Sequence, residues 1–308
     1  MSIFGHKKVF AANTVTCPMN DKGPDGRTGR PASSVSLFGK GAVHRPTEID
    51  ILGANARAAL VASDSLPMFT PSRVWKSLTE AALSDQVLIE NGLFPLSSSE
   101  PAVAAFDLLR TRLMQGLAKK GWRRIAVTSP THGCGKSFVA ANLALSLSRR
   151  PEGRSVLVDL DLRSPQLAQL MGLKQPVDLR EFLIGEQPLE ATFRRHGRQL
   201  ALALNTVSVA DTPTLLQDPE LHRSLETIID QLDPEIIVYD MPPALVCDDL
   251  LAIASQVDAV LLVVDGTKTA PEEIRRCEEL LTDTLPLMGV VLNRSQDLRL
   301  GRYRYRKD

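Results

Sequence analysis

A stretch near the middle of the chain carries the residues best suited to bind phosphate. Residues 130–137 read PTHGCGKS and follow the apolar run IAVTS. The phosphate-loop pattern is G-x-x-x-x-G-K-[ST], and Gly135, Lys136 and Ser137 satisfy its end. Pro130 stands where the first glycine belongs, and it removes one N–H at the start of the loop. The later residues make the turn around the phosphates, so we expect a working loop.

The residue types in this loop each have a chemical reason. Glycines at 133 and 135 let backbone N–H groups approach phosphate, and the start of the following helix favours an anion. Lys136 would reach the β- and γ-phosphates, and the Ser137 hydroxyl would lie on Mg²⁺. A chance G-x-G-K-S turn is the alternative, but the flanking strand and helix patterns favour a real loop. The predicted nucleotide contacts are Thr131, His132, Gly133, Cys134, Gly135, Lys136, Ser137 and Phe138.

Three aspartates follow two other apolar runs. The run VLVDLDLR places Asp159 and Asp161 two residues apart, so both point to one face if the strand persists to Asp161. Two neighbouring carboxylates repel each other unless a cation compensates, and Mg²⁺ bound to ATP would do so. Capping of the next helix is the alternative. Asp240 ends the run IIVYD, which is the Walker B arrangement of a carboxylate on the metal.

The surrounding pattern alternates apolar runs with amphipathic helices, which predicts a three-layer α/β/α domain with a mostly parallel sheet over residues 100–298. The runs that we expect to form strands are 124–129, 155–161, 200–204, 235–240, 259–265 and 288–293. The helical patterns are 136–149, 165–171, 178–184, 189–196, 216–232, 248–256 and 271–283. Before them, the helical spacing from Pro101 places Val103, Phe106, Leu109 and Leu113 on one face.

The remaining segments differ in composition from this domain. Residues 16–47 contain five glycines and four prolines without any period, so we expect residues 1–70 to be mostly disordered. Residues 71–99 are predicted to form a short helical linker, and residues 299–308 a basic tail. The linker residues expected to dock onto the domain are Trp75, Leu78 and Leu83.

Composition excludes several classes of protein. The 36 basic and 36 acidic residues balance, so no global charge points to nucleic acid, and none is expected as a partner. The four cysteines form no C-x-x-C pair, which argues against a disulfide framework or a zinc site. No apolar run reaches the roughly 18–20 residues of a membrane helix, and the N-terminus does not resemble a signal peptide. We therefore expect a cytoplasmic protein that reaches a membrane only through a partner.

Two absent motifs narrow the nucleotide class. Partitioning ATPases of this architecture carry a second lysine at the second loop position, where this chain has Thr131. Ras-type GTPases recognise guanine with N-K-x-D, which the end of the last predicted strand, VLNRSQD, lacks. ATP is therefore favoured over GTP.

Taken together, these motifs resemble those of the bacterial tyrosine kinases (BY-kinases) of capsule and exopolysaccharide synthesis. The resemblance covers roughly residues 100–305 and rests on FDLLRTRL, VTSPTHGCGKSFVAANLALSLS, VLVDLDLRSPQLAQLMG, IIVYDMPPAL, VDAVLLVVDGTKT and GVVLNR. It implies a P-loop kinase, related to the partitioning ATPases, that moves the ATP γ-phosphate onto tyrosines of its own C-terminal tail.

The resemblance also assigns roles to particular residues. Lys136 and Ser137 hold phosphates and Mg²⁺, Asp161 and Asp240 hold the metal, and Asp159 accepts the tyrosine proton. Of the three tyrosines, Tyr239 belongs to a buried strand and is excluded. The expected phosphoacceptors are Tyr303 and Tyr305, in the tail GRYRYRKD. A basic tail that touches lipid or RNA is the alternative.

The chain departs from the family pattern at its subunit contact. Many members carry E-x-x-R-x-x-R in the helix before the first strand, where this chain has Ala104, Asp107 and Arg110. The expected partners are the cytoplasmic tail of a separate membrane-spanning chain-length regulator and further copies of the chain. Two other functions stay open: an ATPase switch that binds a membrane partner in its ATP state, and a non-enzymatic adaptor, which the intact loop and aspartates disfavour.

Overall fold

The computed structural model describes residues 70–95, 98, 101–173, 175 and 177–295. Its strands are β1 (Thr79–Glu80), β2 (Arg124–Thr128), β3 (Ser155–Asp159), β4 (Arg194–His196), β5 (Leu200–Ala203), β6 (Ile236–Asp240), β7 (Ala259–Asp265) and β8 (Leu287–Asn293). Its helices are α2 (Pro71–Ser77), α3 (Asp85–Glu90), α4 (Pro101–Lys120), α5 (Lys136–Ser148), α6 (Leu167–Leu170), α7 (Leu179–Leu183), α8 (Leu189–Thr192), α9 (Thr212–Leu216), α10 (Pro219–Leu232), α11 (Asp249–Ala252), the 3₁₀ turn η1 (Ala254–Gln256) and α12 (Pro271–Leu281).

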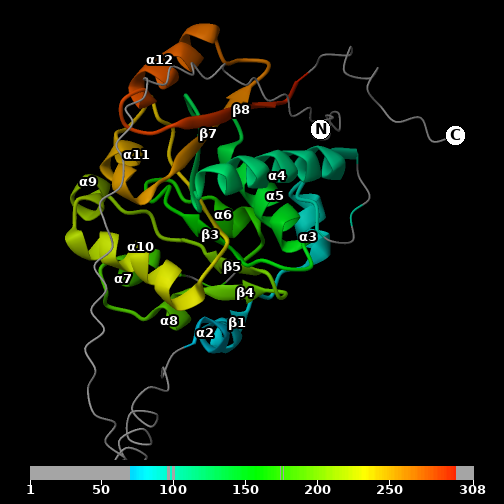
Figure 1. Cartoon of the computed structure of the whole chain (residues 1–308), viewed down its shortest axis with the longest axis vertical. Helices are drawn as coiled ribbons and strands as arrows, with labels where there is room; N and C mark the ends of the chain where they lie inside the picture. Colours follow the sequence, from blue (N-terminus) through cyan, green and yellow to red (C-terminus); the bar gives the residue numbers. More distant parts are fainter. Residues whose placement is uncertain (1–69, 96–97, 99–100, 174, 176, 296–308) are drawn as a thin grey trace, which may run out of the picture. The chain divides into compact units, whose positions relative to one another are not determined.

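The strands form one sheet in the order β1-β4-β5-β3-β6-β2-β7-β8 (Figure 1). The strands β5, β3, β6, β2, β7 and β8 run parallel to one another, whereas β4 pairs antiparallel with β5 and β1 follows the direction of β4. Every residue of β3, β5, β6 and β7 is buried, as expected for strands that helices cover on both faces. The predicted three-layer, mostly parallel α/β fold is confirmed.

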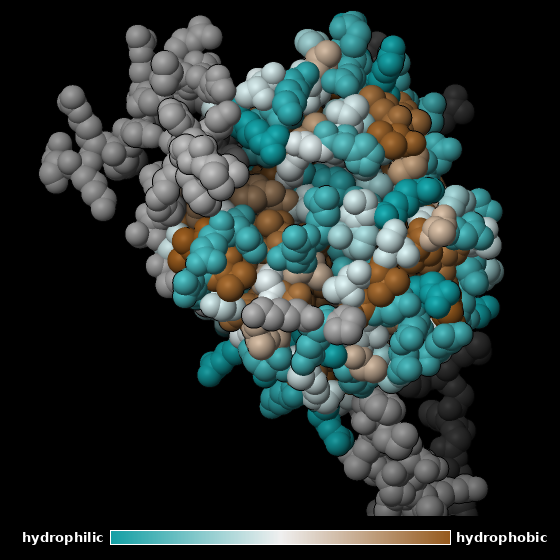
Figure 2. Space-filling model, turned by 180° about the vertical axis from the view of Figure 1, so that it is seen from behind, coloured by the Kyte–Doolittle hydropathy of each residue, from teal (hydrophilic) through white to brown (hydrophobic). Residues whose placement is uncertain are grey.

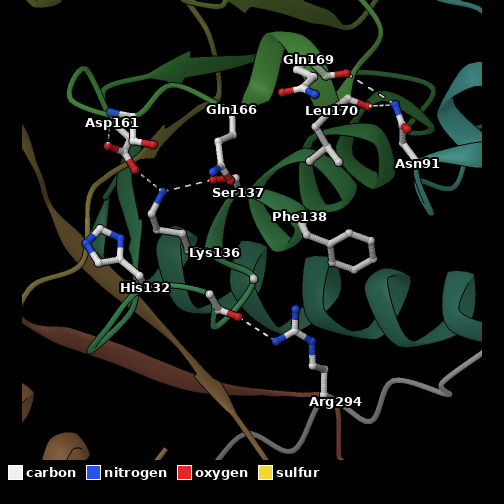
Figure 3. Close-up of a pocket in the computed structure, with 13 residues that line it drawn as sticks. Asn91, His132, Lys136, Ser137, Phe138, Asp161, Gln166, Gln169, Leu170 and Arg294 are labelled. Atoms are coloured by element: carbon white, nitrogen blue, oxygen red, sulfur yellow. Dashed lines mark hydrogen bonds and ion pairs between the residues drawn. The ribbon is translucent and has the colours of Figure 1, made fainter. Parts of the chain in front are cut away.

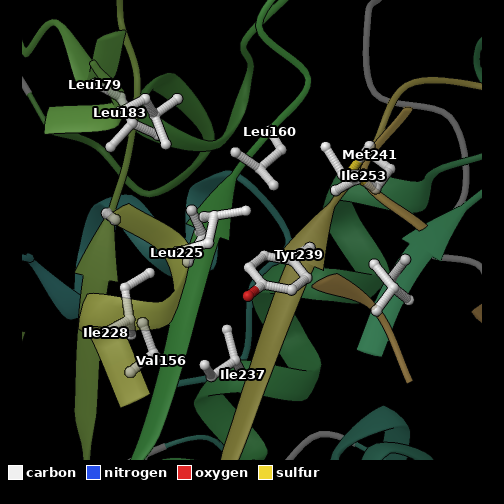
Figure 4. Packing of buried hydrophobic residues seen from close by; sticks show 14 of the residues in the cluster. Val156, Leu160, Leu179, Leu183, Leu225, Ile228, Ile237, Tyr239, Met241 and Ile253 are labelled. Carbon is white, nitrogen blue, oxygen red and sulfur yellow. The ribbon is translucent and has the colours of Figure 1, made fainter. Parts of the chain in front are cut away.

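Two hydrophobic clusters mark the two faces of the sheet. One joins the sheet to α2, α7 to α11 and α12, and the other joins it to α3, α4, α5 and α6. In the first cluster the ring of Tyr239 packs with Leu225 and Ile253 (Figure 4), and this tyrosine has no exposed surface. The prediction that Tyr239 belongs to a buried strand is confirmed.

The six predicted strands all form, but the segment 189–196 was predicted as one helix and this prediction is wrong. The helix α8 ends at Thr192, and Arg194–His196 form β4 instead. The antiparallel pairing of this segment with β5 supplies backbone hydrogen bonds that outweigh its helical pattern. The predicted helix 216–232 is likewise divided, because Pro219 begins a new helix after α9.

The segment 71–99 contributes more than the predicted short helices. Both α2 and α3 form, and between them β1 extends the sheet by pairing with β4. Trp75 and Leu78 are buried as expected, while Leu83 is only partly buried. In α4, Phe106, Leu109 and Leu113 are buried as predicted, but Ala102 replaces the half-buried Val103 on the inner face. The proposed division at residue 100 stays a prediction.

On the face that Figure 2 shows, hydrophobic side chains lie in separate small groups among hydrophilic ones. Among the described residues, the most exposed large apolar side chains are Ile89 on α3, Leu108 on α4, and Val207 and Val246 in loops. Within the described ranges, no helix is long and apolar enough to cross a membrane. The predicted disordered segment 1–70 and tail 299–308 lie outside the described residues, Thr70 excepted.

Candidate active site

The phosphate-loop segment lies between β2 and α5, as its sequence context predicts. Gly133 and Gly135 both have positive φ, 79° and 91°, so their backbone adopts a conformation that costs other residues energy. A Cβ atom on Gly135 would lie 2.2 Å from the Asn293 side-chain nitrogen. The glycine at 135 is therefore required both for the turn and for close packing beside the helix N-terminus.

Pro130, at the position of the missing glycine, is held by neighbouring backbone. Its carbonyl accepts a hydrogen bond from the Leu245 N–H at 3.2 Å, and the Ser129 carbonyl accepts one from Ala244 at 2.8 Å. Both donors follow β6, so the start of the loop is fixed to the neighbouring strand connection. The proline leaves the glycines at 133 and 135 free to make the turn, which agrees with the predicted relaxed loop.

Lys136 lies at the centre of a buried charge cluster. Its Nζ is 2.6 Å from Asp161 Oδ2, 3.4 Å from Asp240 Oδ1 and 3.1 Å from the Ser137 Oγ. Burial is the largest single influence and lowers the pKa of Lys136, but attraction to Asp240, Asp161 and Asp159 outweighs it and raises the pKa. The ammonium therefore stays protonated and is available to neutralise phosphate charge.

Asp159 and Asp240 lie side by side because they are register partners at the ends of β3 and β6. Both are completely buried, and the Oδ2 atom of each has no hydrogen-bond partner. Burial first, and then the charge of Asp240, raises the pKa of Asp159 well above its ordinary value. Burial likewise raises the pKa of Asp240 to about 6, against the opposing attraction of Lys136. This pair of carboxylates is thus short of positive charge.

Asp161 takes a different position from Asp159. The strand β3 ends at Asp159, so Asp161 lies in the turn beyond it and the condition of a continuous strand is not met. Its Oδ1 accepts a hydrogen bond from the Ser164 N–H at 3.2 Å, while Oδ2 binds Lys136. One carboxylate therefore both holds the turn after β3 and faces the lysine. The alternative, capping of the next helix, is wrong for α6, whose N-cap is Gln166 and has no side-chain cap hydrogen bond.

A cavity of about 510 Å³ lies over the loop (Figure 3). Its lining residues are Asn91, His132, Gly133, Gly135, Lys136, Ser137, Phe138, Asp161, Ser164, Gln166, Gln169, Leu170 and Arg294. Most of the predicted nucleotide contacts thus lie on its wall. Thr131 and Cys134 do not, since the Cys134 thiol points to the hydroxyls of Thr131 and Thr269. Asp159 and Asp240 lie behind the wall, and Tyr303 and Tyr305 lie outside the described residues.

The donors around Lys136 suit Mg²⁺ held together with phosphate. Mg²⁺ commonly uses one or two carboxylates and takes its other ligands from water and substrate phosphates. The unpartnered Oδ2 atom of Asp240, the Asp161 carboxylate and the Ser137 hydroxyl are donors of this kind. The unpartnered Oδ2 of Asp159 belongs to the register partner of Asp240. Among the described residues, no three histidine, cysteine or acidic side chains are grouped to hold a metal unaided.

Sequence reasoning missed the residues that hold the loop from β8. Asn293 Nδ2 donates to the Cys134 carbonyl at 2.8 Å. Arg294 Nη1 donates to the Gly133 carbonyl at 2.7 Å and lies 2.6 Å from Asp265 Oδ2. Arg294 adopts a positive φ of 56°, which is uncommon for a residue with a Cβ. The signal available was the pair Asn-Arg at the end of the partly buried strand β8, in the position where GTPases carry N-K-x-D.

At the altered subunit-contact positions, the side chains of Asp107 and Arg110 bind each other and helix α5 of the same chain. Arg110 Nη1 lies 2.8 Å from Asp107 Oδ1 and donates to the Ser146 carbonyl at 2.7 Å. The Ser146 hydroxyl in turn donates to Asp107 Oδ1 at 2.7 Å. These contacts tie α4 to α5, so both charged side chains have partners on the chain's own helices.

Comparison with known proteins agrees with this geometry. Residues 122–298 match the family model ParA, described as NUBPL iron-transfer P-loop NTPase. Over 219 residues the chain is 30% identical to the putative tyrosine-protein kinase EpsB of Ralstonia solanacearum, covering 67% of this chain and 28% of that protein. It is 29% identical over 196 residues to the succinoglycan biosynthesis transport protein ExoP of Rhizobium meliloti, covering 61% and 24% respectively.

Among solved structures, the BceF tyrosine kinase domain superimposes with a TM-score of 0.57 and 25% sequence identity, covering 70% of this chain and 90% of that one. The predicted relationship of this chain to the bacterial tyrosine kinases is thus confirmed. The chain spans only about a quarter of the length of EpsB and ExoP, 28% and 24%.

Proposed function

The chain belongs to the ParA family of P-loop NTPases, and on that basis we propose that it is an ATP-dependent protein-tyrosine kinase. Its relatives include a protein named a tyrosine-protein kinase and one named for succinoglycan biosynthesis. These names support a role in the synthesis or export of an exopolysaccharide or capsule.

One observation carries the proposal: Lys136 is surrounded by three aspartates at the start of the helix that follows the loop. Phosphoryl transfer depends mainly on positioning and on neutralising charge, and this cluster does both. Lys136 binds Asp161 and Asp240 in this structure, so on phosphate binding it exchanges part of those contacts for phosphate oxygens. Backbone N–H groups at Gly133 and Gly135 and the N-terminus of α5 bind the remaining oxygens.

The aspartates divide into a metal-holding and a proton-accepting role. Asp161 and Asp240, with the Ser137 hydroxyl, would hold Mg²⁺. When bound, the metal neutralises phosphate charge. Asp159 would accept the tyrosine proton, and burial together with the charge of Asp240 raises its pKa above the ordinary value, which makes the carboxylate a stronger base. Asp159 has no exposed surface, so this role requires the substrate hydroxyl to reach past the cavity wall.

We assign Tyr303 and Tyr305 as the acceptors and place the protein at the inner face of the cell membrane. The neighbouring arginines make the tail basic, which favours its approach to a site that contains three aspartates. The proposed partner is the cytoplasmic tail of a membrane-spanning chain-length regulator. A second copy of the chain would present its tail to the site.

A second function is favoured by the position of Asp159. If its burial prevents contact with any acceptor, the same loop, lysine and metal ligands would still hydrolyse ATP. The protein would then be a switch that binds a membrane partner in its ATP state and releases it after hydrolysis.

Transfer of phosphate from γ-labelled ATP with Mg²⁺ tests the kinase proposal. The wild type should label itself, whereas Lys136→Met should not, because the variant lacks the phosphate-binding ammonium. The double variant Tyr303→Phe/Tyr305→Phe should hydrolyse ATP without labelling. Label that persists on this double variant would refute the assigned acceptors. ATP hydrolysis by the wild type without label, even with the partner's tail present, would favour the switch.

A further inference from the structure

The cavity over the phosphate loop has two chemically different ends (Figure 3). At one end lie Lys136 and Asp161, which bind phosphate and its counter-ion. The other end extends past Phe138 to Leu170 and Asn91. The volume of about 510 Å³ lies in the range of small-molecule sites. With the triphosphate over the glycines, the end that Asn91 bounds has room for the nucleoside.

The orientation of the Asn91 amide is determined by its neighbours. Its Nδ2 donates to the Leu170 carbonyl at 2.9 Å and approaches the Gln169 carbonyl at 3.5 Å. Backbone carbonyls only accept hydrogen bonds, so the nitrogen must face α6 and cannot be exchanged with the oxygen. The oxygen Oδ1, a pure acceptor, is the atom left for a ligand in the cavity.

The backbone at Asn91 is also fixed. The helix α3 ends there, with N–H groups of Asn91 and Leu93 donating to the Val87 and Leu88 carbonyls at 3.0 and 2.8 Å. Gly92, at a φ of 79°, makes the turn, and a Cβ on it would lie 3.4 Å from the Phe138 ring. Asn91 therefore approaches the site from a firmly placed helix end.

We propose that Asn91 selects adenine, because its Oδ1 accepts a hydrogen bond from the 6-amino group of the base. This inference rests on the proposed ATP site. Purines with a 6-oxo group, such as hypoxanthine and guanine, would place an acceptor against this acceptor and be disfavoured. The residue comes from the segment 71–99, outside the phosphate-loop motifs, and it gives this segment a part in substrate choice.

The expected selectivity is moderate. Asn91 is exposed, and a single neutral hydrogen bond at such a position corresponds to about a three- to tenfold preference for ATP over ITP. ITP differs from ATP at the 6-substituent that Asn91 would read, which makes it the most direct probe. GTP also adds a 2-amino group and is a less direct comparison.

Competition of ATP and ITP against a fluorescent ADP tests the inference on the full chain. The wild type should prefer ATP about three- to tenfold, and Asn91→Ala should lose that preference through weaker ATP binding with ITP binding unchanged. Gln86→Ala is the matched control, because Gln86 is an exposed carboxamide on the same helix that binds Glu90 instead. It should retain the wild-type preference.

Two results would overturn the inference while leaving the proposed function intact. One is equal binding of ATP and ITP by the wild type. The other is an equal loss of both in Asn91→Ala, which would mean that the residue only ties α3 to α6. A wild type that binds neither nucleotide would instead refute the proposed function itself.

Discussion

Replacing Asp240 with asparagine should change the stability of the protein in a pH-dependent way. Relative to the wild type, the variant should gain stability as the pH rises from acidic to neutral. Asp240 has no exposed surface, and its Oδ2 has no partner. Burial, opposed in part by Lys136, raises its pKa from 3.8 to about 6. Between these values the folded state binds more protons than the unfolded state, so the wild type loses stability as pH rises from about 4 to about 6.

The raised pKa gives the size of the effect. A pKa raised from 3.8 to about 6 corresponds to about 3 kcal/mol of native-state stability that is absent above pH 6 and present below pH 4. Asparagine cannot ionise, so the variant does not undergo this loss. Its buried NH₂ group adds a cost of about 1–3 kcal/mol if it finds no acceptor, but that cost does not depend on pH.

Urea unfolding of both proteins at pH 4 and pH 7.5 measures the difference. Between these pH values the stability of the variant should increase by about 3 kcal/mol relative to the wild type. Asp230→Asn, an exposed change on α10, should alter stability by no more than about 0.5 kcal/mol at either pH. A difference that stays constant with pH, or that favours the wild type at pH 7.5, would refute the description of Asp240 as a buried, undercompensated carboxylate.

Three further changes test the remaining contacts. Lys136→Met should abolish phosphate transfer and lower stability by about 3–5 kcal/mol at pH 7 in urea unfolding, because buried carboxylates lose their cation. A stability loss under 1 kcal/mol would contradict this. Gly135→Ala should abolish ATP binding, because the added Cβ meets the Asn293 amide. Gly133→Ala has open space around the added Cβ and should cost only about 1–2 kcal/mol of stability. Equal effects of the two changes on ATP binding would argue against the clash at Gly135. Arg294→Ala should weaken ATP binding about three- to tenfold in calorimetry, because the Gly133 carbonyl loses its donor; unchanged affinity would show that the contact does not position the loop.

The long strands and the loop were predictable because their signals are local. Strands such as β6 and β7 are continuous runs of apolar residues that end in an acidic residue, Asp240 and Asp265, and such runs are typical of a parallel sheet. The loop is defined by the order of its own residues. The two strands that escaped prediction, Thr79–Glu80 and Arg194–His196, are two and three residues long and mostly polar. They form because a neighbouring strand offers hydrogen bonds, which no local pattern reports.

The residue types of the site were predictable from the sequence, but which of these residues reach the cavity was not. The sequence indicates that Asp159, Asp161 and Asp240 lie at strand ends, but the neighbouring positions of β3 and β6 depend on strand order, which is a property of the whole fold. For the same reason the sequence does not show that Asp161 reaches the cavity while Asp159 lies behind it. Asn91 and Arg294 reach the cavity from positions 45 residues before and 158 residues after Lys136, so no local motif includes them.

The destination of the ATP γ-phosphate tests the central claim most directly. In a single turnover with γ-labelled ATP, Mg²⁺ and the partner's cytoplasmic tail, the label should appear on Tyr303 or Tyr305 of the wild type, as mapped by mass spectrometry. The Tyr303→Phe/Tyr305→Phe variant should release the label only as inorganic phosphate. If the wild type also releases all of its label as inorganic phosphate, the protein is an ATPase and not a tyrosine kinase.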